Sequence, residues 1–212
     1  MQKTKFDILE ATCVPLPFEN VDTDQIIPAR FLSATSREGF GENLFRDWRF
    51  DKSGDLKKEF ILNNPGYQGE VLVAGKNFGC GSSREHAVWA ITGHGFRAVV
   101  SSFFADIFRN NSLNNGLLPV VVPEKYLEDL LKIITDNPGT RIRIDLPNQQ
   151  FSILPDGEPV KFEINPYKKE CLMKGLDDID YLLSIRDIIK AFELRNALKY
   201  DYRNNGYDPE GR

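Results

Sequence analysis

The amino-acid sequence predicts an α/β domain, and two observations carry that prediction. Beyond residue 70, short runs rich in valine alternate with segments of helical periodicity: a strand at 98–101, a helix over 103–111, a strand at 117–122 and a helix over 124–135. Such regular alternation is typical of α/β folds. The second observation is that a chain of 212 residues, 41% of them hydrophobic, is long enough to bury a core.

We expect one domain over residues 1–200, with helices at its C-terminal end. From residue 166 onward the pattern is helical, and one apolar stripe is interpreted as a surface for helix packing: Ile185, Ile188, Ile189 and Phe192. Residues 201–212 lack an apolar pattern and contain turn-forming residues. We therefore expect a flexible C-terminal tail there.

The remaining elements follow from local patterns. Residues 6–14 have the composition of one or two short strands, which Pro15 and Pro17 are expected to end. Residues 42–50 carry apolar side chains at the spacing of a short amphipathic helix. Period-two alternation predicts a hairpin and a further strand at 141–146, 150–154 and 160–164.

Composition narrows the class of function. The net charge is −4 and the pI about 5.3, so the basic surface that nucleic-acid binding requires is missing. No apolar window of 18 residues exists, so we expect neither membrane insertion nor export and place the protein in the cytoplasm. Cys13, Cys80 and Cys171 are odd in number and far apart, which fits reduced thiols. With only two histidines beside them, we expect no metal or cofactor bound by this chain.

The densest group of reactive side chains lies in residues 70–87. A buried strand over Val71–Val73 leads into a turn with three glycines, which permit backbone angles that other residues resist: Gly75, Gly79 and Gly81. Ser82 and Glu85 have the spacing of a capping box, so we expect a helix to begin there and to end near Gly93.

This turn suits an anion. Free N–H groups and the positive end of a helix favour negative charge, and Arg84 can hold a carboxylate or phosphate with two hydrogen bonds. A purely structural turn with a cap is the alternative interpretation. Residues 22–24 leave the same choice open, because Asp and Thr are also common in turns.

Several chemistries can be compared with this segment. No lysine follows the last glycine as a P-loop requires, and the Gly-x-Ser-x-Gly of a nucleophile elbow is absent. A Cys80 nucleophile stays possible, with His86 nearby and a helix terminus to lower the thiol pKa. The other option is carboxylate binding by Arg84 with proton transfer by Ser82 or Ser83. A serine is a weak base, so this option requires an electrophile from a partner.

Three ordered motifs resemble the 3-isopropylmalate dehydratase small-subunit family, the swivel domain of the aconitase superfamily. They are DTDQIIPAR at 22–30, GKNFGCGSSREH at 75–86 and NGLLP at 115–119. The resemblance implies a swivelling β/β/α three-layer domain, as in the C-terminal domain of aconitase. It also implies a large-subunit partner that carries a [4Fe-4S] cluster, whose open iron acts as a Lewis acid on the substrate.

The resemblance assigns roles to matching positions. Ser82 corresponds to the catalytic serine that removes a carbon-bound proton, and five residues correspond to substrate-binding positions: Ser83, Arg84, Thr23, Asp24 and Arg30. The specificity loop corresponds to Phe31, Leu32, Ser33 and Ala34, where relatives that act on tricarboxylates carry an arginine. The uncharged Ser33 and Ala34 therefore favour an isopropyl group over a third carboxylate.

The implied reaction converts 2-isopropylmalate, a small dicarboxylate, to 3-isopropylmalate through isopropylmaleate in leucine biosynthesis. The alternatives are a small subunit of a homoaconitase-like dehydratase, a non-enzymatic organic-acid-binding module and a stand-alone Cys80 hydrolase. We also expect the loop at 33–41 to be mobile, because Ser, Thr and Gly dominate it and half of the active site is contributed by the partner.

Overall fold

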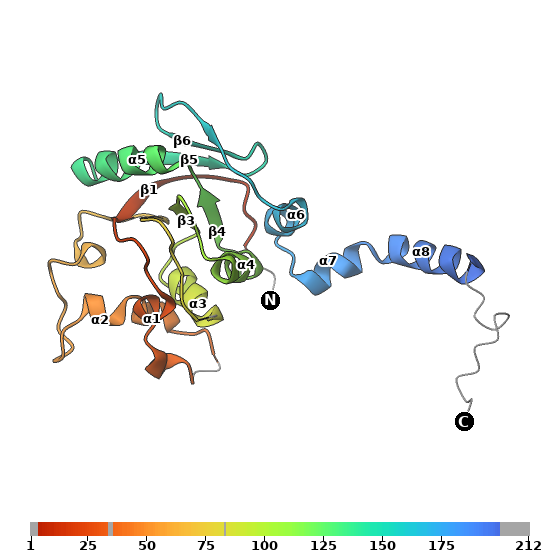
Figure 1. Ribbon diagram of the computed structural model, residues 1–212, viewed down its shortest axis with the longest axis horizontal. Helices are drawn as coiled ribbons and strands as arrows, with labels where there is room; N and C mark the ends of the chain where they lie inside the picture. The colour runs from red at the N-terminus through yellow and green to blue at the C-terminus, as the bar shows by residue number, and fades with distance from the viewer. Residues whose placement is uncertain (1–3, 34–35, 83, 200–212) are drawn as a thin grey trace.

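The computed structural model describes residues 4–33, 36–82 and 84–199, with side chains described through Asn196. Within them, seven strands form one curled sheet in the order β4-β3-β2-β1-β5-β6-β7 (Figure 1). The parallel half consists of β1 (Ile8–Leu16), β2 (Val71–Ala74), β3 (Ala98–Ser101) and β4 (Leu118–Val121). The antiparallel half adds β5 (Arg141–Asp145), β6 (Gln150–Ile153) and β7 (Val160–Lys161).

Helices connect and cover these strands. The longer ones are α3 (Glu85–Gly93), α4 (Asp106–Asn114), α5 (Glu124–Asp136), α6 (Pro166–Lys174), α7 (Asp178–Ser184) and α8 (Arg186–Lys199). Single turns form α1 (Thr23–Ile26), α2 (Arg46–Arg49) and the 3-10 turns η1 (Ala29–Phe31), η2 (Phe40–Asn43) and η3 (Ile61–Asn63). The α/β class predicted from the alternating pattern is confirmed. None of the helices formed by the described residues combines the length and apolar character needed to cross a bilayer.

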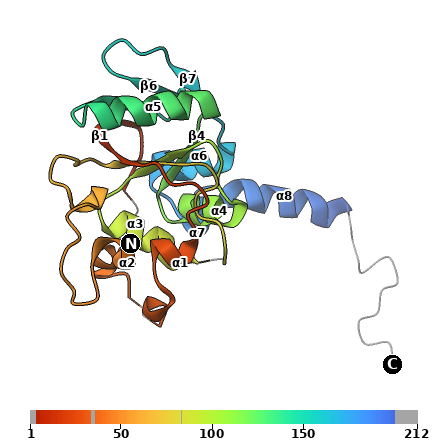
Figure 2. The same cartoon turned by 60° about the vertical axis from the view of Figure 1, so that its left-hand side comes forward.

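Each parallel strand is apolar on both faces and therefore supplies two cores. Val71 and Val73 point into one core, which α5 and the β5–β6 hairpin cover, whereas Leu72 and Ala74 point into the other, beneath α3. Figure 2 shows α5 on one side of the sheet and α1 and α3 on the other. Burial on both faces excludes water from the sheet and fixes the register of its strands.

Three local predictions need correction. Pro15 does not end β1 but lies inside it, opposite Val73. The strand pairs with β5 only as far as Thr12, so from there it has a neighbour on one side and tolerates a residue without an N–H. The predicted helix over 42–50 is reduced to η2 and α2, and the predicted strand at 160–164 to β7. The predicted hairpin of β5 and β6 is confirmed.

The C-terminal helices differ most from expectation. The stripe of Ile185, Ile188, Ile189 and Phe192 was interpreted as a packing surface, yet Ile188 is 69% exposed and Phe192 is 55% exposed. In Figure 1, α7 starts next to α6 and α4, and α8 continues from it away from the sheet. Ile185 and Ile189 are half-buried, so within the described residues the stripe is only partly covered. The predicted tail at 201–212 lies outside the described residues.

Candidate active site

The two candidate segments meet at the carboxyl ends of β1 and β2, because these parallel strands are neighbours. Backbone hydrogen bonds join the loops that follow them. The Val21 carbonyl accepts from the N–H groups of Gly79 (2.8 Å) and Cys80 (3.2 Å), and the Thr23 N–H donates to the Cys80 carbonyl (2.9 Å). Residues almost 60 positions apart are thereby held in one local structure.

The Asp22–Asp24 segment is both a helix cap and part of this structure. The Asp22 side chain accepts from the Gln25 N–H and forms a capping box that begins α1. Thr23 is only 2% exposed, and its hydroxyl donates to the Ser82 carbonyl over 2.9 Å. Thr23 therefore supports the backbone of Ser82 from inside the protein.

Glycine is required at two positions of the loop. Gly79 has φ +77°, and an added Cβ would lie 2.2 Å from the Phe108 ring. At Gly75 an added Cβ would lie 2.4 Å from the Phe18 carbonyl oxygen. These close approaches bring the loop against α4 and the chain after β1, which directs Ser82 outward.

Arg84 and Asp24 form an ion pair across the two loops. The guanidinium donates to both carboxylate oxygens, with Nη2 2.8 Å from Oδ2 and Nη1 bonded to Oδ1. The Arg84 side chain is 14% exposed and that of Asp24 is 54% exposed. Hydrogen bonds from Arg84 hold the pKa of Asp24 below its ordinary value, so this carboxylate is charged at neutral pH.

Ser82 is exposed at the end of the loop, but it does not cap the next helix. Helix α3 begins at Glu85, with Arg84 as an N-cap residue that makes no side-chain capping bond. The predicted Ser82–Glu85 capping box is therefore wrong, since Glu85 lies toward Arg37 instead (3.5 Å). Ser83 lies outside the described residues.

Cys80 lacks the electrostatics of an activated nucleophile. Partial burial and the nearby Asp22 carboxylate raise the pKa of its thiol, against the predicted lowering. The His86 ring packs at a tilt against the Trp89 ring, with 4.5 Å between centroids, and against the Phe40 ring. The geometry thus disfavours the Cys80 hydrolase.

The residues after α1 divide into a charged group and an apolar group. The Arg30 guanidinium bonds to both oxygens of Asp47, with Nη1 3.0 Å from Oδ2, and lies 4.8 Å from the Phe31 ring centroid. Phe31 and Leu32 are half-buried against the core under α3, and Ser33 is exposed. Ala34 lies outside the described residues. A surface cavity of about 730 Å³ beside Arg30 and Phe31 does not include Ser82 or Arg84.

The far end of the predicted mobile loop is packed onto α3. Phe40 is 3% exposed, and the backbone of Gly41 touches that of Gly93, where a Cβ on Gly41 would lie 2.1 Å from the carbonyl carbon. The Arg37 guanidinium lies 4.8 Å from the Trp89 ring centroid. Residues 37–41 are therefore held by specific contacts, whereas residues 34 and 35 fall outside the described part of the chain.

The described residues also include no group of three His, Cys, Asp or Glu side chains placed to hold a metal ion. The site consists of the exposed Ser82 hydroxyl, the Arg84 guanidinium paired with the Asp24 carboxylate, and the apolar side chains of Phe31 and Leu32 nearby in the loop after α1. Such a set can bind a carboxylate and transfer a proton beside it.

Comparison with known proteins agrees with this chemistry. Residues 3–125, more than half of the chain, match the aconitase C-terminal domain, and residues 128–166 match LeuD_N. The chain therefore belongs to the aconitase C-terminal domain family, and the predicted swivel-type fold is confirmed.

The relatives define the branch of this family. The chain is 60% identical over 195 residues to the 3-isopropylmalate dehydratase small subunit of Christiangramia forsetii, which covers 92% of this chain and 95% of the relative. It is 58% identical over 189 residues to that of Cytophaga hutchinsonii, with 89% and 94% covered. The crystal structure of 3-isopropylmalate dehydratase from Methanocaldococcus jannaschii is 31% identical, with a TM-score of 0.61 over 88% of this chain and 99% of that one. Within the aconitase class, the chain belongs with the 3-isopropylmalate dehydratase small subunits.

Proposed function

We propose that this chain is the small subunit of a 3-isopropylmalate dehydratase, in which Ser82 moves the carbon-bound proton and Arg84 binds a substrate carboxylate. The relatives support the activity, and one geometric observation supports the assignment of roles. Ser82 is exposed at the end of the glycine loop, and its own carbonyl accepts a hydrogen bond from the buried Thr23 hydroxyl. Two positions later, the Arg84 guanidinium is paired with Asp24. The proposed base and the proposed carboxylate-binding group thus lie two positions apart at the end of one loop.

Arg84 keeps hydrogen-bonding capacity for a substrate. A guanidinium carries five N–H groups, and the two contacts to Asp24 use one on each terminal nitrogen. Asp24 is mostly exposed, so a dicarboxylate can approach the same fork from solvent. In this proposal Asp24 orients Arg84, and Thr23 orients Ser82 without touching substrate. Ser83 retains its proposed contact with a substrate carboxylate from the family resemblance.

The proton transfer by Ser82 requires that the partner activates the substrate. The family resemblance assigns this to a [4Fe-4S] cluster in the large subunit, which polarises the hydroxyl group that leaves and returns. The described residues of this chain provide no ligand set for such a cluster. In this proposal the small subunit contributes Ser82, the carboxylate-binding Arg84 and the surface around the substrate side chain.

The loop after α1 fits an apolar substituent. Phe31 and Leu32 are half-buried against the core, and the Ser33 side chain is uncharged. Of the two cations between α1 and Gly41, Arg30 is held by Asp47 and Arg37 lies toward Glu85. We infer that Arg30 orients the loop and that 2-isopropylmalate is preferred, because a third carboxylate would be left without a charged partner there.

Reconstitution tests this function. The chain alone is expected to show no dehydratase activity, and anaerobic mixing with a cluster-loaded large subunit should produce turnover of 2-isopropylmalate. Ser82→Ala should lower kcat in the complex by about 10³-fold or more, because the proton acceptor is lost. Circular dichroism and the unfolding midpoint should stay unchanged, since Ser82 is exposed.

Cys80→Ala is the matched control in the same loop and should retain most of the turnover. Near-normal activity of Ser82→Ala would refute the assignment of the base. Activity that disappears with Cys80→Ala, or robust turnover by the isolated chain, would favour a hydrolase-type reaction. Binding of isopropylmalate without turnover in the reconstituted pair would favour an organic-acid-binding module.

A further inference from the structure

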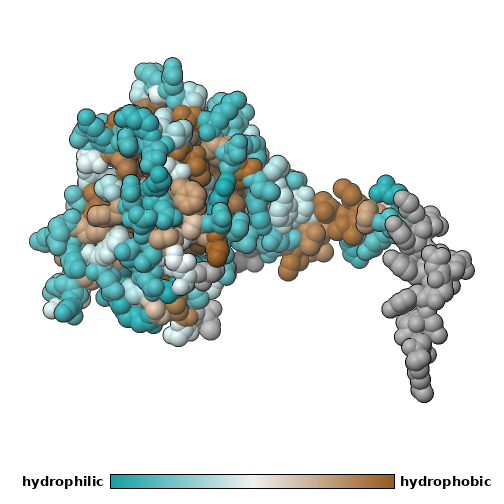
Figure 3. Space-filling model, viewed as in Figure 1, coloured by the Kyte–Doolittle hydropathy of each residue, from teal (hydrophilic) through white to brown (hydrophobic). Residues whose placement is uncertain are grey.

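The C-terminal arm, defined as residues 178–196, exposes more large apolar side chains than any other described segment. Between half and about two-thirds of each of six side chains is open to solvent: Ile179, Leu182, Leu183, Ile188, Phe192 and Leu194. Figure 3 shows brown side chains along the segment that projects from the domain. None of the residues of α8 described through Asn196 is buried. An exposed apolar surface of this kind usually marks a site of interaction with another molecule.

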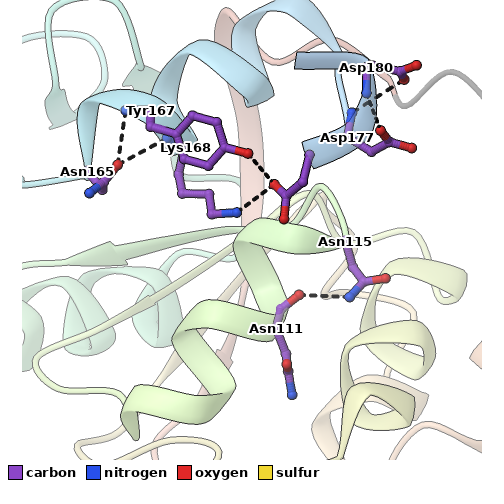
Figure 4. A network of polar contacts seen from close by, with 8 residues as sticks. Asn111, Asn115, Asn165, Tyr167, Lys168, Asp177 and Asp180 are labelled. Atoms are coloured by element: carbon purple, nitrogen blue, oxygen red, sulfur yellow. Dashed lines mark hydrogen bonds and ion pairs between the residues drawn. The ribbon is translucent and has the colours of Figure 1, made fainter. Parts of the chain in front are cut away.

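The base of the arm is anchored, so its direction is set by the domain. The Tyr167 hydroxyl (2.6 Å) and the Lys168 ammonium (2.8 Å), both on α6, donate to the Asp178 carboxylate at the start of α7. Figure 4 shows these contacts beside α4, which carries Asn111 and leads to Asn115. The Tyr167 and Tyr181 rings are edge to face with centroids 4.6 Å apart. The arm therefore leaves the domain at a fixed place.

Beyond this anchor the helices lack the burial that usually stabilises helices. Helix α7 has 7 residues and α8 has 14. Isolated helices of such length are marginal in water, and helices in proteins gain most of their stability from packing of an apolar face. Ile188 and Phe192 are four positions apart and form one such face, which is mostly exposed although the Arg195 guanidinium lies 5.8 Å from the Phe192 ring centroid. A second surface is needed to cover it.

The comparisons indicate which surface this is. A match of 195 residues in a chain of 212 necessarily includes residues 18–195, so the arm through Arg195 lies within the region shared with the small subunit from Christiangramia forsetii. That match covers 95% of the relative, so the arm is part of a nearly complete small subunit. The relatives are named as small subunits, and such a name implies a large subunit as the partner.

The apolar surface also continues from the arm toward the candidate active site. Phe103 and Ile107 are each 51% exposed. The Phe103 carbonyl accepts from the Phe78 N–H in the glycine loop (3.2 Å), Ile107 lies on α4, and α4 packs against α6. A partner that covers Ser82 and Arg84 and extends over α4 therefore reaches the base of the arm.

We propose that the C-terminal arm is a docking element for the large subunit, which covers the apolar face of α7 and α8 while it closes the active site. This inference rests on the proposed function, because it takes the large subunit as the partner. The arm then contributes binding energy at a distance from the reacting atoms, and its apolar side chains become buried on assembly.

The test uses the full chain and the cluster-loaded large subunit. The double substitution Ile188→Glu with Phe192→Glu should weaken the Kd between the subunits at least tenfold, measured by isothermal titration calorimetry. Both side chains are exposed, so the unfolding midpoint of the isolated chain should not change. Turnover at saturating large subunit should stay within about twofold of wild type, since neither residue belongs to the site. Ile133→Glu on α5, where Ile133 is 40% exposed on the face of the sheet opposite α1 and α3, is the control and should leave the Kd unchanged.

An unchanged Kd in the double variant would overturn the inference while leaving the proposed function intact if the complex still turns over. Sedimentation decides the competing occupant: a wild-type chain that is a dimer on its own, and a double variant that is a monomer, would assign the arm to a second copy and also overturn it. Failure of the wild-type complex to act on 2-isopropylmalate would instead count against the proposed function, and the Kd comparison would remain readable.

Discussion

In the proposed function, the ion pair with Asp24 prepares the Arg84 cation for an anionic substrate. A nearly buried guanidinium without a partner would be costly, and Asp24 supplies two charge-assisted hydrogen bonds that remove this cost and fix the plane of the fork. Asp24 itself stays in contact with water. The pair therefore orients Arg84 before the substrate arrives, which reduces the entropy lost on binding.

The pair also predicts a pH dependence of stability. Because the folded pKa of Asp24 is depressed, its contribution is present above the ordinary aspartate pKa and is lost as the pH falls through the folded value. Solvent screening limits the contribution of this exposed carboxylate to at most about 1 kcal/mol. Asp24→Asn should therefore lower the unfolding free energy by about 0.5–1 kcal/mol at pH 7, and the difference should shrink as the pH falls below the ordinary aspartate pKa of 3.8. Urea denaturation at a series of pH values measures both; a constant difference over the whole range would contradict the assignment.

The residues that the sequence could indicate were those with unusual chemistry at short spacing. Ser82 and Arg84 stand out because they are adjacent to glycines and to a helix start. The partner of Arg84 is 60 positions away and is one of many aspartates, so only the pairing of β1 with β2 reveals it. The same holds for Arg30, whose bond to Asp47 depends on the path of an irregular segment.

At the level of elements, the glycine loop packs so closely against its neighbours that a residue with a Cβ would not fit at Gly79. Gly79 combines a left-handed backbone with direct contact to the Phe108 ring on α4. The loop can pass this point only without a Cβ. The position of Ser82 thus depends on how closely β2, its following loop and α4 approach one another.

Gly79→Ala is expected to destabilise the protein by about 2–4 kcal/mol, from the left-handed backbone together with overpacking against Phe108. Gly116→Ala is the matched control, because Gly116 has φ +80° but no atom within 4 Å of the added Cβ. It should cost only about 1–2 kcal/mol from the backbone. Chemical denaturation of both variants gives the comparison, and equal losses would show that the contact with Phe108 is unimportant.

The elements that the sequence predicted well are those with long periodic patterns. Helix α5 and the β5–β6 hairpin lie close to their predicted ranges, because burial on one face imposes their periodicity. The capping box at Ser82 failed for a tertiary reason. The Ser82 carbonyl is bonded to Thr23 and Glu85 is drawn toward Arg37, so the helix starts with neither reciprocal bond.

At the scale of the whole molecule, Cys13 reports on the integrity of the sheet. It is 1% exposed in the centre of β1, and burial raises the pKa of its thiol to about 12. A thiol that ionises only on unfolding favours the unfolded state at alkaline pH. Its contribution to stability is fully present below the unfolded value of 9.0 and is lost as the pH rises toward the folded value.

Wild type should therefore lose about 1 kcal/mol of unfolding free energy between pH 8 and pH 10 through this one group. Cys13→Ala is less stable than wild type at pH 8 because of the lost packing, and the gap should narrow by that amount at pH 10. Equilibrium unfolding at the two pH values, with a reductant present, measures the gap. A gap that is independent of pH would place the Cys13 thiol in contact with water.

The overall architecture was predictable from alternation, whereas the arm was not. The stripe along α8 has the spacing of a packed helix, and nothing in one sequence tells whether the covering surface lies in the same chain or in another. Intrachain packing is the more economical interpretation of such a stripe. Its exposure beyond an anchored α7 is a property of the three-dimensional structure.

The contact between the backbones of Gly41 and Gly93 has a consequence for how substrate range can change. It fixes the end of the specificity loop to the last turn of α3, while the first turn of that helix follows Ser82. In the proposed function, the loop that reads the substrate side chain and the loop that carries the proton-transferring Ser82 are therefore both attached to the same helix. Under the proposed roles, substitutions at Phe31, Leu32 and Ser33 would change which substrate side chain is accepted, while the start of α3 after Ser82 would stay the same.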